Sequence, residues 1–300
     1  MNKNISNIKT VSEYNDLLGV ETLHPLVSVI DLSKVDPINN MRLIFDFYVV
    51  FLKEDKNCDL LYGRQRYDYQ KGSIVSLAPG QVIGTEDTGE KFQPKGWALC
   101  FHPDLIRGTT LGCNIKEYTF FSYEVNEALH LSEKERTIII DCLEKIRYEL
   151  QQSIDRLSKR LIATNIELLL DYCLRFYERQ FITRCEANKI ILHKIHSLLN
   201  GYILSGRLEG GAMPTEEYCA DALHLSPCYF RDLLKFETGK SMHEYFQLMR
   251  LDMAKKMLRN KDYTVGMTAR KLGYANSQHF TCLFKKITGM TPTEYKYAQN

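Results

Sequence analysis

One helical element occurs twice in the last third of this 300-residue chain, and this repeat constrains the fold more than any other feature. The segment HLSPCYFRDLLKFETGKSMHEY runs from His224 to Tyr245, and GYANSQHFTCLFKKITGMTPTEY runs from Gly273 to Tyr295. Five shared residues lie fifty positions apart: Phe230, Leu233, Lys235, Thr238 and Gly239 match Phe280, Leu283, Lys285, Thr288 and Gly289. Upstream the offset is 49, since Thr215, Ala220 and Leu223 match Thr264, Ala269 and Leu272. One residue is therefore inserted in the turn of the second copy.

Each copy predicts two helices joined by a tight turn, at about 215–224 and 227–237 and again at about 265–272 and 277–287. Ser226 before Pro227 is a typical helix start, because the Ser side chain caps the helix and Pro loses no hydrogen bond at the first helical position. Asn276 is the corresponding cap, and Gly239 and Gly289 stand where helices end in the left-handed conformation. Such a pair is a helix-turn-helix, whose second helix can lie in the major groove of DNA.

The segment SMHEYFQLMRLDMAKKMLRN between the copies predicts one long helix. Ser241 and Glu244 form a capping box, and the helix is expected to last to about Arg259. Twenty helical residues span about 30 Å, and one turn of B-DNA measures about 34 Å. A connector of this length can place two recognition helices in successive major grooves on one face of the duplex.

The beginning of the chain predicts strands. RLIFDFYVVFLKE, GSIVSLAPGQVIG and GWALCFH are short apolar runs broken by Gly and Pro, which favours a β-sandwich or β-barrel. From about Asn126 apolar residues recur every three or four positions to about Gln180, after a capping box at Ser132 and Glu135. We expect an α+β chain: a strand-rich domain at 1–125, a helical linker at 126–185, and at 186–300 an all-α domain with two helix-turn-helix units joined by a long helix.

The linker helices support two interpretations. Leu143, Leu150 and Leu157 fall seven residues apart, which favours a dimer seam. The same apolar stripe equally fits packing against the strand-rich domain, so both interpretations stay open.

Composition narrows the class of protein. An apolar fraction of 44% and a charged fraction of 25% are those of a soluble globular chain. The net charge is +2, but residues 186–300 carry 16 Lys/Arg and 11 Asp/Glu, which favours a polyanionic partner for this part. No apolar run has the length of a membrane span, and the N-terminus lacks the apolar core of a signal peptide. Nine Cys without a C-x-x-C motif predict reduced thiols and a cytoplasmic location.

From about Asn188 to Tyr297 the chain resembles the DNA-binding domain of the AraC/XylS family of bacterial transcription regulators. The segments that carry the resemblance are SPCYFRDLLKFETGKS, YFQLMRLDMAKKML, ARKLGY and SQHFTCLFKKITGMTPTEY. It implies a sequence-specific, non-enzymatic transcription regulator that binds double-stranded promoter DNA, with RNA polymerase as a further partner. More loosely, the strand-rich part is similar to the cupin-like sensor domain of such regulators, and the central helices resemble their dimerisation linker. A homodimer and a small-molecule effector are implied in the same way.

Helical spacing separates an inner from an outer face in each second helix. The inner faces are expected to hold Phe230, Leu233 and Leu234 in the first copy, and Phe280, Leu283, Phe284 and Ile287 in the second. The resemblance places DNA base readers on the outer faces, at Cys228, Arg231 and Asp232 in the first copy and at Ser277, Gln278, Thr281 and Cys282 in the second.

Side-chain chemistry assigns roles on these faces. Arg231 suits guanine and Gln278 suits adenine. Contacts to phosphate are expected from Lys235, Lys285 and Lys286. The carboxylate of Asp232 and the small side chain of Cys228 put in doubt how much discrimination the first helix supplies. His279 either faces the groove or packs beneath it.

The strand-rich part offers a weaker signal for an effector. By the resemblance, a ligand pocket inside the barrel would draw on Tyr48, Tyr62, Arg64, Trp97 and His102, although core packing or a solvated strand face explains each equally well. Only His24 and His102 lie in this part, so we expect neither a catalytic metal nor a cofactor. His193 and His196 lie three apart on a predicted helix, but two His alone do not make a metal site.

Two alternatives remain. An enzyme fused to this module, such as a Cys-dependent DNA-repair protein, would need an activated thiol, and no Cys lies in a recognisable nucleophile motif beside a base. A degenerate repeat used for protein contacts is supported only by Asp232 and by the modest basic charge.

Overall fold

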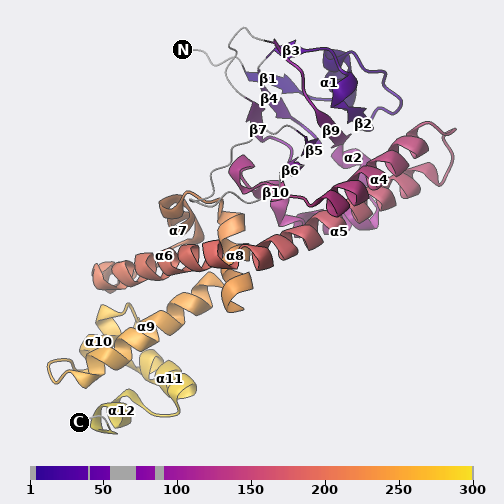
Figure 1. Cartoon of the computed structure of the whole chain (residues 1–300). Coiled ribbons are helices and arrows are strands. Elements are labelled where there is room, and N and C mark those ends of the chain that lie inside the picture. Colours follow the sequence, from indigo (N-terminus) through magenta and orange to yellow (C-terminus); the bar gives the residue numbers. More distant parts are fainter. Residues whose placement is uncertain (1–4, 40, 55–71, 85–90, 299–300) are drawn as a thin grey trace. The chain divides into compact units, whose positions relative to one another are not determined.

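The computed structural model describes residues 5–39, 41–54, 72–84 and 91–298 (Figure 1). The chain forms two compact units, residues 1–183 and 184–300, which we call the N-terminal and C-terminal units. Among the described residues, every strand lies in the N-terminal unit together with helices α1–α5, and the C-terminal unit is helical. The expected α+β class with an all-α C-terminal part is confirmed. A separate linker domain at 126–185 stays a prediction.

A five-stranded antiparallel sheet forms the centre of the N-terminal unit. Its order is β10 (Leu129–His130), β6 (Ser73–Leu77), β5 (Tyr48–Lys53), β9 (Gly96–Phe101) and β2 (Val27–Asp31). A second sheet has the order β1 (Ile5–Ile8), β4 (Arg42–Phe45) and β7 (Val82–Gly84), with β1 parallel to β4. The short strands β3 (Ile38–Asn39) and β8 (Lys91–Phe92) pair with each other. No sheet closes on itself within the described residues, so of the two predicted forms, β-sandwich and β-barrel, the closed barrel is not formed there.

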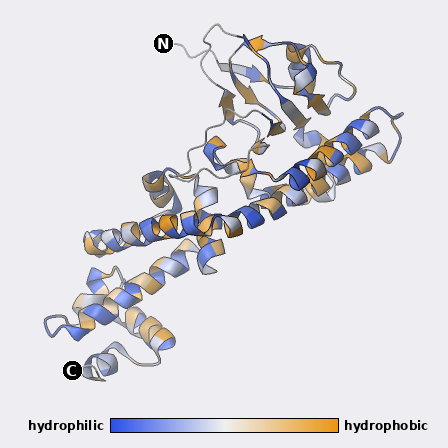
Figure 2. Ribbon diagram, in the orientation of Figure 1, coloured by the Kyte–Doolittle hydropathy of each residue, from blue (hydrophilic) through white to orange (hydrophobic). Residues whose placement is uncertain are grey.

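Side chains that alternate along the strands give the five-stranded sheet two buried faces. One face, with Val49 and Phe51 of β5 and Ala98 and Cys100 of β9, shares an apolar cluster with β1, β4 and α1 (Val11–Leu18). Three aromatic rings fill this cluster, since the centroid of Phe45 lies 5.1 Å from that of Tyr14 and 5.2 Å from that of Phe47. Figure 2 shows the resulting concentration of apolar colour on the strands.

Helices lie on the opposite face of the sheet. They are α2 (Pro103–Ile106), α3 (Thr110–Asn114), α4 (Glu133–Leu150) and α5 (Ser158–Thr183). The predicted capping box at the start of α4 is confirmed, because the Ser132 hydroxyl accepts from the Glu135 N–H while the Glu135 carboxylate accepts from the Ser132 N–H. α4 packs along α5 and contacts β2, and α5 contacts β10. The linker helices therefore pack on the sheet, as one of the two interpretations expects.

A continuous leucine seam is not formed. Leu143 and Leu150 are buried within the N-terminal unit, and α4 ends at Leu150. Leu157 precedes α5 and is 45% exposed. The three residues therefore lie on two elements separated by a turn, and the seven-residue spacing does not describe one helix face.

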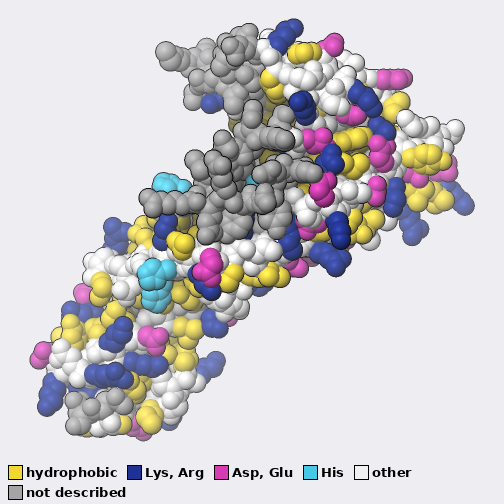
Figure 3. Space-filling view, viewed as in Figure 1, with side chains coloured by type: hydrophobic (Ala, Val, Ile, Leu, Met, Phe, Trp, Pro, Cys, Tyr) yellow, Lys and Arg dark blue, Asp and Glu magenta, His cyan; other side chains and the backbone are white. Residues whose placement is uncertain are grey.

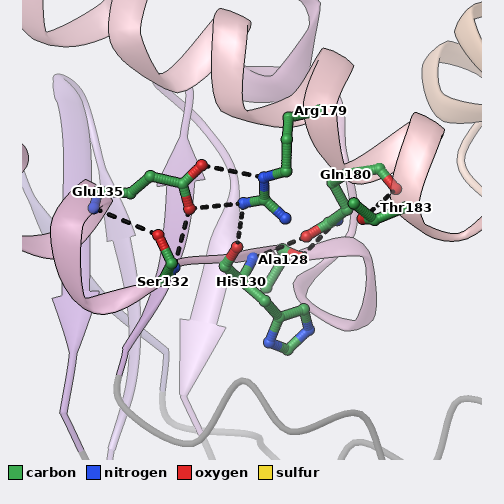
Figure 4. A network of polar contacts seen from close by, with 7 residues as sticks. All are labelled: Ala128, His130, Ser132, Glu135, Arg179, Gln180 and Thr183. Atoms are coloured by element: carbon green, nitrogen blue, oxygen red, sulfur yellow. Dashed lines mark hydrogen bonds and ion pairs between the residues drawn. The ribbon is translucent and has the colours of Figure 1, made fainter.

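Figure 4 shows how the last turns of α5 are attached to β10. Arg179 donates to both carboxylate oxygens of Glu135, at 2.9 and 2.8 Å, and to the carbonyl of His130 at 2.7 Å. The Gln180 amide accepts from the His130 N–H at 2.8 Å and donates to the Ala128 carbonyl at 3.2 Å. A strand of two residues is thereby bonded along its edge to side chains of α5.

Besides the short 3-10 helix η5 (Arg207–Gly210), the described part of the C-terminal unit holds seven α-helices, and the helices of the repeat and of its connector lie within a few residues of the predicted bounds. The seven are α6 (Cys185–Leu204), α7 (Glu216–Leu223), α8 (Pro227–Thr238), α9 (Met242–Arg259), α10 (Val265–Lys271), α11 (Ser277–Thr288) and α12 (Pro292–Ala298). α6 packs against α7, α8 and α9, while α10 and α12 pack against α9 and α11. Along α6 and α9 apolar and polar residues alternate, as Figure 2 shows, so each helix has one side to bury.

Within the described residues no helix is long and apolar enough to cross a membrane. In the same part of the chain, His, Cys, Asp and Glu side chains form no group of three that could hold a metal ion.

Candidate nucleic-acid interface

The two tight turns have the same hydrogen bonds. In the first helix-turn-helix (α7–α8), Leu225 N–H donates to the Ala220 carbonyl at 3.0 Å and His224 N–H donates to the Asp221 carbonyl at 3.2 Å. In the second (α10–α11), Tyr274 N–H donates to the Ala269 carbonyl and Gly273 N–H to the Arg270 carbonyl, both at 3.0 Å. This pair of bonds is a Schellman motif, which needs a left-handed residue after the helix. His224 (φ 56°) and Gly273 (φ 73°) fill that position.

The helices that follow the turns begin and end alike. Ser226 and Asn276 cap α8 and α11 by accepting from the backbone N–H three residues on. Gly239 and Gly289 end the two helices with φ values of 68° and 80°. These local signals explain why the sequence alone located the helices so closely.

The inner faces of α8 and α11 form the core of the repeat. Phe230, Leu233 and Leu234 are buried, as predicted, and so are Phe280 and Phe284. Leu283 is only half-buried, and Ile287 is 43% exposed. The prediction for Ile287 is wrong because it lies in the last turn of α11, beyond the part that its neighbours cover.

The long connecting helix α9 fixes the second turn through Arg250, which is 5% exposed. Its Nε donates to the Leu272 carbonyl at 2.9 Å, and its guanidinium carbon lies 4.0 Å from the centroid of the Tyr274 ring. Burial lowers the pKa of Arg250, and the neighbouring Tyr274 hydroxyl offsets part of this lowering. Arg250 thus joins α9 to the residues that close the second turn. The predicted capping box at Ser241 and Glu244 begins α9 as expected.

The outer face of α8 is occupied by paired charges. An Arg231 terminal nitrogen lies 3.6 Å from a Glu216 carboxylate oxygen, and its Nε lies 4.0 Å from an Asp232 oxygen. The other terminal nitrogen is 3.2 Å from the Cys228 sulfur. Partial burial acts to lower the pKa of Arg231, but Cys228, Glu216 and Asp232 outweigh this effect and raise it. Lys235 is exposed on the same helix.

The outer face of α11 is more open. Ser277, Gln278 and Cys282 are exposed, as are the two lysines 285 and 286 near the helix end. Thr281 is half-buried and its hydroxyl donates to the Ser277 carbonyl at 2.7 Å. His279 is exposed, with its ring centroid 6.1 Å from that of Tyr274, so it does not pack beneath the helix.

The structure brings together only part of the predicted effector set. Tyr48 stacks on Phe101, with ring centroids 5.0 Å apart, and His102 follows Phe101 and caps α2. Trp97 lies near the other end of β9, five residues before His102, which is about 16 Å along an extended chain at 3.3 Å per residue. Its ring lies beneath Arg147 of α4. Tyr48 and Trp97 point to the helix-covered face of the sheet and not into the cluster between the sheets. The remaining two candidates, Tyr62 and Arg64, lie outside the described residues.

Sequence reasoning did not single out Glu216 and Arg250. Glu216 contacts Arg231 only through the packing of α7 on α8, so no local pattern points to it. A signal for Arg250 does exist: it lies four residues after Phe246 and four before Ala254, both buried, and hence on the apolar stripe of α9.

Comparison with known proteins agrees with this geometry. Residues 219–298 match the model of a family described as a helix-turn-helix domain. An uncharacterised HTH-type transcriptional regulator of Bacillus subtilis, YtdP, is 42% identical over 82 residues, which are 27% of this chain and 11% of that protein. The bifunctional transcriptional activator/DNA repair enzyme AdaA of the same organism is 38% identical over 82 residues, 27% of this chain and 39% of that protein. The chain thus spans well under half the length of these relatives.

A longer match is more distant. The uncharacterised HTH-type regulator YijO of Escherichia coli is 24% identical over 225 residues, 75% of this chain and 76% of that protein. Among solved structures, a transcriptional regulator with an AraC-type DNA-binding domain from Chromobacterium violaceum is 18% identical, covering 37% of this chain and 93% of that one with a TM-score of 0.33. Residues 219–298 of this chain therefore match a helix-turn-helix domain.

Proposed function

We propose that this protein is a sequence-specific DNA-binding transcription regulator. The observation that carries the proposal is the presence, within one compact unit, of two helix-turn-helix elements with matching turns and caps and with polar outer faces on α8 and α11. The 18 residues of α9 between them span about 27 Å. That length suits two helices that enter successive major grooves, which lie about 34 Å apart.

The proposed contacts follow from side-chain chemistry. Gln278 would pair with adenine and Arg231 with guanine, each worth about 1–3 kcal/mol of discrimination. Further base contacts are assigned to the other outer-face residues, Cys228, Asp232, Ser277, Thr281 and Cys282. Phosphate contacts are assigned to Lys235, Lys285 and Lys286, whose exposure leaves their ammonium groups accessible.

The direct test is selection of bound fragments from a pool of genomic DNA by the purified full-length protein. We expect a small set of enriched fragments that share a motif, bound with an affinity that falls steeply with salt. The double variant Arg231→Ala/Gln278→Ala should lose the preference for that motif while keeping its non-specific binding. A matched control is Arg156→Ala/Gln152→Ala, which removes an exposed Arg and Gln from the turn between α4 and α5. Unchanged preference in the first variant would refute the assigned readout.

We further propose that a small molecule bound by the N-terminal unit controls DNA binding. Support comes from a hollow of about 280 Å³ lined mainly by β2, the turn that follows it and the end of α4. Its wall includes Asp31 and Arg147, which neighbour Trp97 of the predicted effector set. A change in thermal stability on addition of a metabolite extract, lost in Trp97→Ala, would support this control.

Homodimerisation and contact with RNA polymerase belong to the same proposal, since both are implied by the AraC resemblance. Sedimentation of the full-length protein over a range of concentrations tests the dimer. Transcription in vitro from a selected fragment, with purified polymerase, tests the second contact.

The thiols bear on the alternative of a Cys-dependent enzyme. A nucleophilic Cys needs a lowered pKa. Burial instead raises the pKa of Cys100, Cys142 and Cys173, and it raises that of Cys219 to about 11 with a further contribution from Glu216. A thiol-reactivity profile with one fast Cys at neutral pH would favour the enzyme over the regulator.

A further inference from the structure

The two helix-turn-helix elements carry opposite charge. Helices α7 and α8 hold two cations and five carboxylates, a net charge of −3: Arg231 and Lys235 against Glu216, Glu217, Asp221, Asp232 and Glu237. Helices α10 and α11 hold four cations and no carboxylate, a net charge of +4: Arg270, Lys271, Lys285 and Lys286. Affinity for duplex DNA comes largely from cations that replace the counterions of phosphates. The charge of the second element therefore attracts the DNA backbone, whereas that of the first element repels it.

A comparison of equivalent positions on the two outer faces shows the same difference, with more negative charge on the first element. At the offset of fifty, Asp232 corresponds to Cys282, so a carboxylate in the first element is a neutral thiol in the second. Arg231 corresponds to Thr281, and the positive charge of Arg231 is shared with Glu216 and Asp232. At one equivalent position both outer faces carry a cation, Lys235 in the first element and Lys285 in the second, and both side chains are exposed.

The connecting helix adds to the difference. The basic residues in its last turn, Lys256 and Arg259, lie at the end that leads to α10. In Figure 3 the Lys and Arg side chains on the visible face spread more widely over α9–α12 than the acidic side chains do. The positive potential of the C-terminal unit thus centres on the second element.

We infer that the two elements bind DNA unequally: the second supplies most of the affinity through phosphates, and the first adds mainly one sequence-reading contact by Arg231. Glu216 and Asp232 act on that contact as positioning residues, because they hold the guanidinium between α7 and α8. This inference rests on the proposed function and specifies how its site works.

Lys235 and Lys285 allow a matched test, since they occupy the same position of the repeat. The full-length variants Lys235→Gln and Lys285→Gln are titrated onto one selected DNA fragment at several salt concentrations. Each phosphate contact contributes about 0.9 to the slope of log K against log salt. We expect Lys285→Gln to lower the slope by about 0.9 and Lys235→Gln to lower it by less than half of that. Equal reductions would overturn the inference while leaving DNA binding itself intact.

Glu216→Gln tests the positioning role. Removing this carboxylate frees Arg231 and lowers local repulsion, so we expect tighter binding together with weaker preference at the base pair that Arg231→Ala also affects. Glu217→Gln is the control, because it removes the neighbouring carboxylate in the same turn of α7, which forms no ion pair with Arg231 among the described residues. Equal effects of the two variants on the base preference would refute a positioning role. Failure of the unaltered protein to bind any fragment at low salt would overturn the proposed function and this inference together.

Discussion

The left-handed position in the two turns gives a sharp prediction, because the same substitution should act differently in the two elements. Gly273 has a φ of 73°, and its Cα lies close to the loop before α7. A Cβ at this position would stand 2.7 Å from the Leu208 carbonyl oxygen and 3.2 Å from its Cβ. His224, its equivalent, already places a side chain at φ 56° in an exposed position.

The expected costs follow from these contacts. A non-glycine residue in the left-handed region costs about 1–2 kcal/mol, and the close approach to Leu208 adds to it. Gly273→Ala should therefore weaken the second element by at least about 2 kcal/mol, which is about thirtyfold in a local opening equilibrium. His224→Ala keeps the strain that the first turn already has and changes an exposed side chain, so it should stay within about 0.5 kcal/mol.

Hydrogen exchange measured by mass spectrometry separates the two elements within the full-length chain. Amide protection in α10 and α11 reports the opening of the second element, and that in α7 and α8 reports the first. We expect about thirtyfold faster exchange in α10–α11 of Gly273→Ala, and nearly unchanged exchange in α7–α8 of His224→Ala. Equal acceleration by both variants, or none by Gly273→Ala, would refute the packing argument.

Three further predictions concern stability. Arg250→Met removes the buried donor of the Leu272 carbonyl, which should lower the free energy of opening of the second element by about 1–3 kcal/mol. Amide exchange in α10 should become faster accordingly, while that in α7 changes less. Gln180→Leu removes the side-chain hydrogen bonds to the His130 N–H of β10 and to the Ala128 carbonyl just before it, and the melting temperature of the full chain should fall by several degrees, unlike that of an exposed Gln152→Leu control. Hydrogen bonds from Ser241 to Glu244, the backbone N–H above all, lower the pKa of this carboxyl. Its capping box should therefore be fully formed above the unfolded-state pKa of about 4.3 and be lost as pH falls through the lower folded value, seen as faster exchange at the start of α9.

Local signals explain why so much of the C-terminal unit follows from the sequence. Ser226-Pro227, Asn276 and the glycines that end α8 and α11 act within one turn of chain, so their positions fix the helices without knowledge of the fold. The prediction for Ile287 is wrong because burial in the last turn of a helix depends on which neighbour covers it.

Tertiary arrangement explains the rest. The partition of the strands among three sheets, one with a parallel pair, depends on pairings between distant segments that no local pattern encodes. The seven-residue spacing of Leu143, Leu150 and Leu157 suggested one seam, but α4 ends at the second of them. The ion pair of Glu216 with Arg231 likewise exists only because α7 packs on α8.

In the proposed mode of binding, one chain contacts DNA through two helices set one helical turn apart. Hydroxyl-radical footprinting of the full-length protein on a selected fragment tests it most directly. We expect two protected segments on one face of the duplex, about 10 base pairs apart, with the stronger protection at the segment that Lys285→Gln weakens. A single protected segment would contradict binding through two helices. Equal loss of protection in Lys235→Gln and in Lys285→Gln would contradict the unequal contributions of the two elements.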